Sequence, residues 1–411
     1  MLDPIVVTGV GVVSPIGNKQ EDLWDSINQG RIGTSTIENF DTSKLNVKIA
    51  ARVKNFESSF LSTKEHKRYS DYIKFAVDAS GQAIVDAFKS KENLPVAPER
   101  IGVIIGVGQG SQDRVYKAVK SFEAKATVSP LLIPTITPNM AAGVVAQKFG
   151  LQGVCMGIST ACASGAHAIA VAASLIRDNM ADLFVVGGSE ACLSPTAVAG
   201  FDAARALTRD FNHSPEEASR PFDHNRSGFV IGEGAGVVTI EKESRARARG
   251  AKIYGYLAAS GLSADAHHIT APEPSGRGMI QSMSQALKMA KLLPQDIDYI
   301  NAHGTSTLAN DYTESLAISR VFPHANNRLY VSSTKGYTGH CIGGAGGIEA
   351  VISLLALKHQ KAPKSVNLAK QSDDININVS HPNRLTRLEN VMTNSFGFGG
   401  QNVSLIFSRA A

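Results

Sequence analysis

Short apolar runs alternate with helix-like segments along the whole chain of 411 residues. This alternation predicts an α/β fold built around parallel strands. The first run, within residues 1–17 (MLDPIVVTGVGVVSPIG), is interrupted by glycines and has no basic segment ahead of it, so we interpret it as a strand and not as a signal peptide. No run of about 18 apolar residues occurs, and we therefore expect no membrane span.

The pattern occurs twice. In each half, an apolar strand ending in glycine is followed later by a second strand, a serine-threonine pair, a polar turn and a helix rich in glycine and alanine. These segments are RIGVIIGVGQG and GISTACASGAHAIAVAASL in the first half, and IDYINAHGTST and VSSTKGYTGHCIGGAGGIEAVISLLAL in the second. LFVVGGSE and NSFGFGGQN form another matched pair. We therefore predict two related α/β halves, residues 1–250 and 251–411, whose ligands bind beyond the carboxyl ends of the strands.

Composition narrows the class of protein. Hydrophobic residues make up 43% and charged residues 19% of the chain, which is ordinary for a soluble globular protein. Four cysteines do not make a disulfide framework at this length, and we expect the reducing environment of the cytoplasm. The net charge of +5 is too small for a dedicated nucleic-acid binder, but it suits a surface that meets an acidic partner.

Cys162 is the first candidate for chemistry. It stands where a strand-like run gives way to a helix of small residues, which we expect to be buried on all sides. The positive end of the helix dipole there would favour a thiolate and lower the pKa of the thiol. A packed core thiol is an equally good interpretation of this segment alone.

Two further loops carry histidines. His303 follows an apolar strand directly, and Thr305 and Thr307 place hydroxyl groups after it. We expect Asp311 and Glu314 to hold this loop by hydrogen bonds. Each lone histidine has the alternative interpretation of a satisfied core residue.

The next loop carries Lys335 and His340 ahead of a second helix of small residues. An ion pair between Lys335 and Glu349 is plausible if both are buried. A fourth loop, residues 394–402, has glycines that let backbone N–H groups approach a ligand, with Phe396 and Phe398 as apolar walls. By itself this loop is equally consistent with a tight turn between two strands.

Together these groups favour one chemistry. A thiolate, two neutral imidazoles and a glycine-rich N–H donor are suited to acyl transfer through a thioester. The sequence contains no CxxC, no HExxH and no glycine-rich phosphate loop with a lysine, so metal and nucleotide chemistry have no motif support.

The four motifs STACASG, NAHGTST, STKGYTGH and NSFGFGGQN, in this order and spacing, resemble those of the type II β-ketoacyl-acyl carrier protein synthases. The resemblance covers essentially the whole chain, and ASRPFDHNRSGFVIGEGAG strengthens it. It implies a thiolase-like fold of five layers, αβαβα, made of two pseudo-symmetric halves. It also implies a homodimer that uses no cofactor and receives its substrates on the phosphopantetheine of acyl carrier protein (ACP).

The resemblance implies a decarboxylative Claisen condensation that gives 3-oxoacyl-ACP in fatty acid elongation. Cys162 would take the acyl chain as a thioester, and His303 and His340 would stabilise the enolate of malonyl-ACP. The N–H groups of Cys162 and Phe398 would form the oxyanion hole, and Phe398 would also gate the acyl pocket. Lys335 would tune the electrostatics and anchor the His340 loop, with Glu349 as its partner.

The resemblance also implies where the substrate and its carrier bind. Thr305 and Thr307 match positions that hydrogen-bond the pantetheine arm. Lys67, Arg68 and Arg205 match the basic patch that meets the acidic carrier.

Departures from the family pattern leave the acyl chain open. They are Gly336 and Tyr337 after the lysine, Cys341 after His340, Gln401, and Gln109 in a segment (residues 106–119) expected to border the acyl pocket. The alternative is therefore a ketosynthase dedicated to a polyene or polyketide pathway, paired with a chain-length-factor subunit. A thiolase would need a second cysteine in the last glycine-rich loop, and a non-catalytic chain-length factor would typically lack the nucleophile.

Overall fold

The computed structural model of the chain describes residues 3–90, 94–323, 329–379 and 387–410. The strands of its main sheet are β1 (Ile5–Val13), β4 (Ile101–Gly106), β5 (Cys155–Ile158), β6 (Leu183–Glu190), β7 (Gly234–Lys242), β8 (Gly255–Ala264), β9 (Tyr299–Asn301), β10 (Tyr330–Ser332), β11 (Asn390–Gly397) and β12 (Gln401–Ser408). A small hairpin is formed by β2 (Thr34–Thr36) and β3 (Ile49–Ala51). The helices are α1 (Gln20–Gln29), α2 (Thr63–Arg68), α3 (Asp71–Phe88), α4 (Gln112–Glu123), α5 (Leu132–Ile136), α6 (Met140–Phe149), α7 (Ser164–Arg177), α8 (Pro195–Ala203), α9 (Glu243–Ala248), α10 (Arg277–Ala290), α11 (Leu308–Val321), α12 (Lys335–Thr338) and α13 (Ala345–His359).

The main sheet consists of two halves with the same strand order. Reading outward from the central pair β1 and β8, one half runs β1-β7-β6-β4-β5 and the other β8-β12-β11-β9-β10. In both halves the three outer strands are parallel, and the next strand inward (β7 or β12) is antiparallel to them. Each strand of the first half therefore has a counterpart in the second, as the repeated sequence pattern predicts. The chain passes from one half to the other between α9 and β8.

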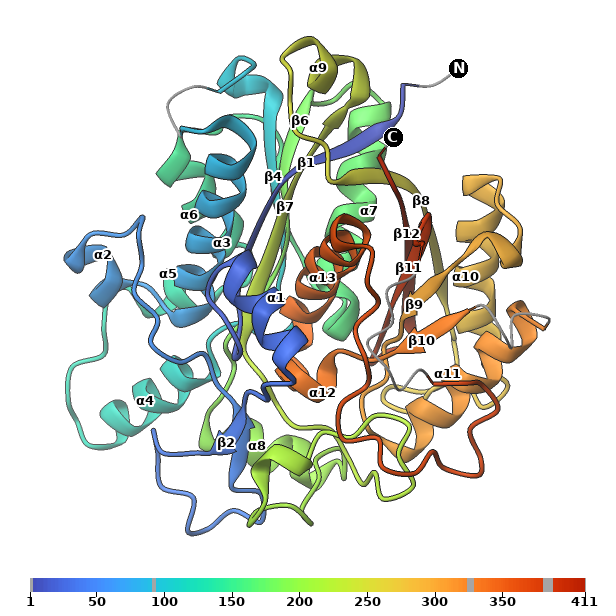
Figure 1. Cartoon of the computed structure of the whole chain (residues 1–411). Helices are drawn as coiled ribbons and strands as arrows, with labels where there is room; N and C mark the ends of the chain where they lie inside the picture. The colour runs from blue at the N-terminus through green and yellow to red at the C-terminus, as the bar shows by residue number, and fades with distance from the viewer. Residues whose placement is uncertain (1–2, 91–93, 324–328, 380–386, 411) are drawn as a thin grey trace.

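The layers follow from which helices touch which strands. Helices α7 and α13 lie between the two half-sheets and contact both, whereas α3 and α6 cover the outer face of one half (Figure 1). Helix α10 covers the outer face of the other half, and α11 packs against α10 and shares an apolar cluster with β9, β10 and β11. This is the five-layered αβαβα arrangement, so the thiolase-like fold expected from the resemblance is confirmed.

The middle layer explains the small residues of α7 and α13. A Cβ atom on Gly165 of α7 would lie 2.8 Å from the backbone nitrogen of Gly347 in α13, closer than real Cβ atoms approach. A Cβ atom on Gly236 of β7 would lie 2.2 Å from the backbone of Gly347. Glycine at these positions lets the two central helices pack directly against each other and against the sheet.

The parallel strands all point their carboxyl ends toward one region, and the loops that follow them gather there. These are the loops that carry the candidate residues. Among the helices of the described residues, none has the length and apolar character that crossing a bilayer requires.

Candidate active site

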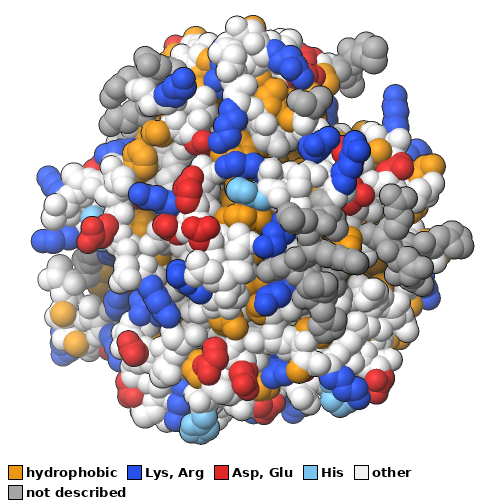
Figure 2. Space-filling view, in the orientation of Figure 1, with side chains coloured by type: hydrophobic (Ala, Val, Ile, Leu, Met, Phe, Trp, Pro, Cys, Tyr) orange, Lys and Arg blue, Asp and Glu red, His pale blue; other side chains and the backbone are white. Residues whose placement is uncertain are grey.

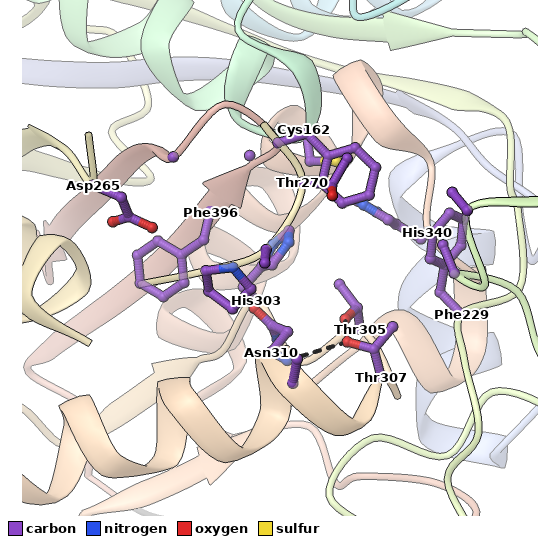
Figure 3. A pocket seen from close by; sticks show the side chains of 18 of the residues that line it. Cys162, Phe229, Asp265, Thr270, His303, Thr305, Thr307, Asn310, His340 and Phe396 are labelled. Atoms are coloured by element: carbon purple, nitrogen blue, oxygen red, sulfur yellow. Dashed lines mark hydrogen bonds between the residues drawn. The ribbon is translucent and has the colours of Figure 1, made fainter. Parts of the chain in front are cut away.

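One cavity of about 250 Å³ lies at the carboxyl ends of the strands, and residues from all four predicted loops line it. Cys162, His303 and His340 line it together, with Phe396 and Phe398 on its wall. Figure 3 shows the cysteine and the two imidazoles directed into the same space. The structure therefore brings together three side chains that lie in distant parts of the sequence.

A tight turn presents Cys162. It belongs to a 3₁₀ turn, Ala161–Ala163, and α7 begins only at Ser164, so the prediction that Cys162 opens the α-helix is wrong by two residues. The residue before the cysteine, Ala161, has φ of 49°, in the left-handed region that a residue with a side chain rarely adopts. This backbone places the sulfur at the cavity rather than in the packed interior of the helix.

Burial gives the Cys162 thiol a high pKa. Desolvation raises the pKa to about 12, although the Lys335 ammonium and a hydrogen bond from the backbone N–H of Phe398 both lower it. The expectation of a resting thiolate is therefore wrong, because desolvation destabilises the thiolate by more than Lys335 and the N–H of Phe398 stabilise it. The N–H of Phe398 nevertheless donates to the sulfur, so a backbone donor lies directly beside the reacting atom.

Lys335 fixes the orientation and the tautomer of His303. Its Nζ lies 3.3 Å from His303 Nδ1, and it also forms an ion pair with Glu349, as the sequence predicts. An ammonium group only donates, so Nδ1 accepts and the ring proton is on Nε2. Lys335 thus acts directly on His303, and it sits in α12 of the same loop that carries His340.

Both imidazoles are neutral. Burial, and after it the nearby Lys335 charge, hold the pKa of His303 and of His340 well below the ordinary value. Their rings lie 5.3 Å apart and nearly perpendicular. The His340 ring also packs edge-on against Phe229 at 5.2 Å, and its buried Nδ1 has no hydrogen-bond partner among the described residues.

Asp311 and Glu314 hold the His303 loop, as predicted. Glu314 accepts hydrogen bonds from the backbone N–H groups of His303 (2.8 Å) and Gly304 (2.7 Å). Asp311 accepts hydrogen bonds from the N–H of Ser306 at 3.2 Å and from the N–H of Phe222, in another loop, at 2.8 Å. Both carboxyls are buried, and desolvation raises the pKa of Glu314 to about 7.

Some of the remaining predicted residues line the cavity, and others do not. Thr305 and Thr307 line it, with their hydroxyl oxygens 2.9 Å apart, and Arg205 lines it as well. Lys67 and Arg68 lie on α2 and are not among its lining residues. Their role in carrier docking stays a prediction.

Sequence reasoning missed two residues. Phe229, which packs against His340, lies in the segment ASRPFDHNRSGFVIGEGAG, and apart from the family resemblance this segment carries no signal for the contact. Glu190, at the end of β6, accepts four backbone N–H bonds, three from the loop of residues 108–110 and one from Gly343. It thereby fixes the first part of the segment that contains Gln109, whose N–H is one of the donors. A buried glutamate ending an apolar strand before a cysteine was the available signal.

The chemistry of the donor set suits acyl transfer. The cavity offers one thiol, two neutral imidazoles and backbone N–H groups, with hydroxyls along its wall. Among the described residues, no group of three or more His, Cys, Asp or Glu side chains is placed to hold a metal ion.

Comparisons with known proteins agree with this geometry. The family model described as "Beta-ketoacyl synthase, N-terminal domain" matches residues 2–246, and "Beta-ketoacyl synthase, C-terminal domain" matches residues 254–369. The chain is 42% identical to the 3-oxoacyl-[acyl-carrier-protein] synthase 2 of Synechocystis and 41% identical to that of Coxiella burnetii. The alignments cover 98% of this chain and 98% of each relative.

Solved structures give the same picture. The ishigamide ketosynthase/chain length factor superposes with a TM-score of 0.92 at 29% identity, covering 100% of both chains. A type II PKS acyl-carrier protein in complex with its ketosynthase bound to the hexaketide (AntDE:AntF) matches with a TM-score of 0.90 at 29% identity, again over 100% of both chains.

Proposed function

Since the chain belongs to the β-ketoacyl synthase family, we propose that Cys162, His303 and His340 carry out its reaction in the cavity described above. The reaction is the decarboxylative condensation of malonyl-ACP with an acyl chain, which gives 3-oxoacyl-ACP and elongates a fatty acid. The observation that carries this assignment is the convergence of one thiol and two neutral imidazoles on a single cavity, with the N–H of Phe398 on the sulfur.

The first half-reaction loads the enzyme. The Cys162 sulfur attacks the thioester carbonyl of acyl-ACP, the carrier thiol leaves, and the cysteine proton ends on that thiol. The oxyanion of the tetrahedral intermediate is held by the N–H groups of Cys162 and Phe398. Removing a donor of this kind typically costs roughly 3 kcal/mol of transition-state stabilisation. Because the thiol has a high pKa, deprotonation accompanies attack rather than preceding it.

The second half-reaction forms the carbon–carbon bond. Malonyl-ACP loses its carboxylate as carbon dioxide, and the electron pair moves onto the thioester oxygen as an enolate. His303 donates to that oxygen from Nε2–H, since Lys335 occupies its Nδ1, and His340 is the second donor. The enolate carbon then attacks the acyl carbonyl on Cys162, and the sulfur leaves as a thiolate that takes up a proton from solvent to restore the thiol.

The carrier and the subunit partner are the finer part of the proposal. The pantetheine arm enters along Thr305 and Thr307, and Lys67, Arg68 and Arg205 meet the acidic carrier. Figure 2 shows Lys and Arg side chains spread over one face of the molecule with acidic ones between them. No separate cofactor is needed, because the substrates travel on phosphopantetheine. All four cysteines are free, as expected in a reducing environment, so we propose a cytoplasmic location.

A homodimer is the subunit arrangement we favour. In the part of the chain that the structure describes, no strand pairs with the outer side of the edge strand β5, and Cys155 and Met156 on it are exposed. An uncovered parallel edge strand is a natural place for a second chain to pair. A chain-length-factor homologue is the other possible occupant, since a structural neighbour is a ketosynthase/chain length factor.

Sequence similarity supports one pathway over the other. The relatives named as 3-oxoacyl-ACP synthases are about 40% identical over nearly the whole chain, whereas the polyketide neighbours are about 29% identical. Fatty acid elongation is therefore favoured over a dedicated polyene or polyketide synthase.

The test is a condensation assay with the purified chain, acyl-ACP and radiolabelled malonyl-ACP. We expect 3-oxoacyl-ACP from the chain alone, and none from the Cys162→Ala variant. Product that forms only after a second ketosynthase-like subunit is added would instead assign the chain to a heteromeric polyketide system.

A further inference from the structure

The turn that carries Cys162 is held by two side chains of the helix behind it. Ser164 Oγ accepts from the backbone N–H of Thr160 at 2.9 Å and donates to the carbonyl of Ala161 at 2.7 Å. His167 Nδ1 lies 3.0 Å from the hydroxyl oxygen of Thr160 and 3.3 Å from the carbonyl oxygen of Ala163. These bonds join the residues on both sides of Cys162.

The His167 ring is a donor here. A carbonyl oxygen only accepts, so the contact with Ala163 requires the proton on Nδ1, and the Thr160 hydroxyl oxygen shares it. Burial holds the pKa of His167 below its ordinary value, which keeps the ring neutral. The contact to Ala163 spans one helical turn, whereas the contact to Thr160 reaches beyond the start of the helix.

The other half of the molecule provides an internal comparison. There a 3₁₀ turn, Ile342–Gly344, precedes α13, and its first residue has φ of 43°, close to the 49° of Ala161. The two turns align residue by residue, which pairs Cys162 with Gly343, Ser164 with Ala345, and His167 with Ile348. Alanine and isoleucine have no polar side-chain atom. The second turn therefore lacks the clamp, meaning the hydrogen bonds of Ser164 and His167, and is bonded instead by Glu190 at the N–H of Gly343. The clamp is present in the half that carries the nucleophile.

The clamp also faces the oxyanion donor. A Cβ atom on Gly397 would lie 2.7 Å from the carbonyl oxygen of Thr160 and 3.4 Å from the backbone nitrogen of Cys162, so the end of β11 is in close contact with this turn. Phe398, whose N–H bonds the Cys162 sulfur, follows directly. A shift of Thr160 would therefore move the sulfur and the Cys162 N–H relative to the N–H of Phe398.

We propose that His167 is a positioning residue for acyl transfer: through Thr160 it keeps the Cys162 turn in the orientation that aligns the sulfur with its oxyanion donors. The proposal rests on the proposed function of Cys162. It predicts that loss of the His167 contact slows loading of Cys162 and spares malonyl decarboxylation, which depends on His303 and His340.

The experiment compares three variants with the wild-type enzyme. His167→Leu removes the donor, and His167→Asn retains an N–H near the position of Nδ1. Ser174→Ala is the matched control, because Ser174 Oγ donates to the carbonyl of Ala170 (3.2 Å), one turn back on the same helix, without touching the Cys162 turn. Three quantities are measured: the single-turnover rate of acyl transfer from acyl-ACP to Cys162 by intact-protein mass spectrometry, the rate of carbon dioxide release from malonyl-ACP, and the melting temperature.

We expect His167→Leu to slow acyl transfer on the order of 10- to 100-fold, the scale of a small misplacement of reacting groups. Its decarboxylation rate should stay within about threefold of wild type, on the scale of a side chain remote from the reacting groups. His167→Asn should recover most of the acyl-transfer rate, and Ser174→Ala should match wild type.

Equal slowing of both partial reactions, or unchanged acyl transfer in His167→Leu, would overturn the proposal. If His167→Leu does not fold, Thr160→Val, which removes the hydroxyl partner, is measured against Thr160→Ser with the same expectations. Failure of the wild-type enzyme to load an acyl chain at all would overturn the proposed function instead, so the two results are distinguishable.

Discussion

Replacing Lys335 with methionine removes a buried ammonium that has two separate roles. Lys335 is 1% and Glu349 4% exposed at the side chain, so the ion pair between them is shielded from water. The same ammonium donates to His303 Nδ1 at 3.3 Å. The substitution therefore affects stability through Glu349 and catalysis through His303, and the two effects are separable.

The stability effect is large for the single variant. Removing one partner of a buried pair typically costs about 3–5 kcal/mol of unfolding free energy, because the group left behind must either stay charged without a partner or take up a proton. Burial already raises the pKa of Glu349 to about 7 against the opposing effect of Lys335, so without Lys335 this carboxyl takes up a proton at neutral pH. The double variant Lys335→Met/Glu349→Gln leaves no charge behind and should recover most of the lost stability.

The catalytic effect should persist in the double variant. A buried hydrogen bond from a charged donor is worth about 1.5–3 kcal/mol, so losing it at His303 predicts decarboxylation of malonyl-ACP slower by about 10- to 100-fold. The measurement is carbon dioxide release from malonyl-ACP, with chemical denaturation run in parallel. The matched control is Glu349→Gln, which keeps Lys335 on His303 and should retain most of the rate. A double variant that is stable and decarboxylates at the wild-type rate would refute the role of Lys335 in setting the His303 tautomer.

Three further predictions concern Cys162, the two histidines of the site, and Glu233, a buried carboxyl directly before β7 that does not line the cavity. Iodoacetamide should alkylate Cys162 about tenfold faster for each pH unit between pH 7 and pH 10, because its pKa is raised to about 12 by burial; a plateau near neutral pH, read by peptide mapping, would restore the thiolate hypothesis. His303→Ala and His340→Ala should each block carbon dioxide release while still allowing mass-spectrometric detection of acyl-Cys162, and loss of loading in both would show that their roles are misassigned. Burial raises the pKa of Glu233 from 4.5 to about 7, so the folded state holds a proton that the unfolded chain releases, and the unfolding free energy falls as pH rises between these values, by up to about 1.4 kcal/mol per unit. Glu233→Gln should flatten that fall between pH 5 and pH 7 in denaturant titrations, and identical slopes would count against it.

The sequence by itself determined the architecture and the reacting groups. Apolar strands and helices of small residues, repeated in two halves, were sufficient to predict a duplicated α/β fold, because periodicity and residue size act locally. Cys162, His303 and His340 could be picked out as candidates because each lies in a loop region that follows a strand, with the short helix α12 between β10 and His340. Parallel strands of one sheet end on the same side.

Only the tertiary structure decided how these groups behave. The sequence indicated a thiolate at Cys162, but the pKa depends on how much water the fold removes, and burial outweighs Lys335 and the N–H of Phe398, which lies far away in the chain. The contact of Lys335 with His303 and the packing of Phe229 on His340 likewise depend on distances that no local pattern encodes. The sequence specifies the chemical type of each side chain, whereas desolvation and proximity between distant residues arise only when the chain has folded.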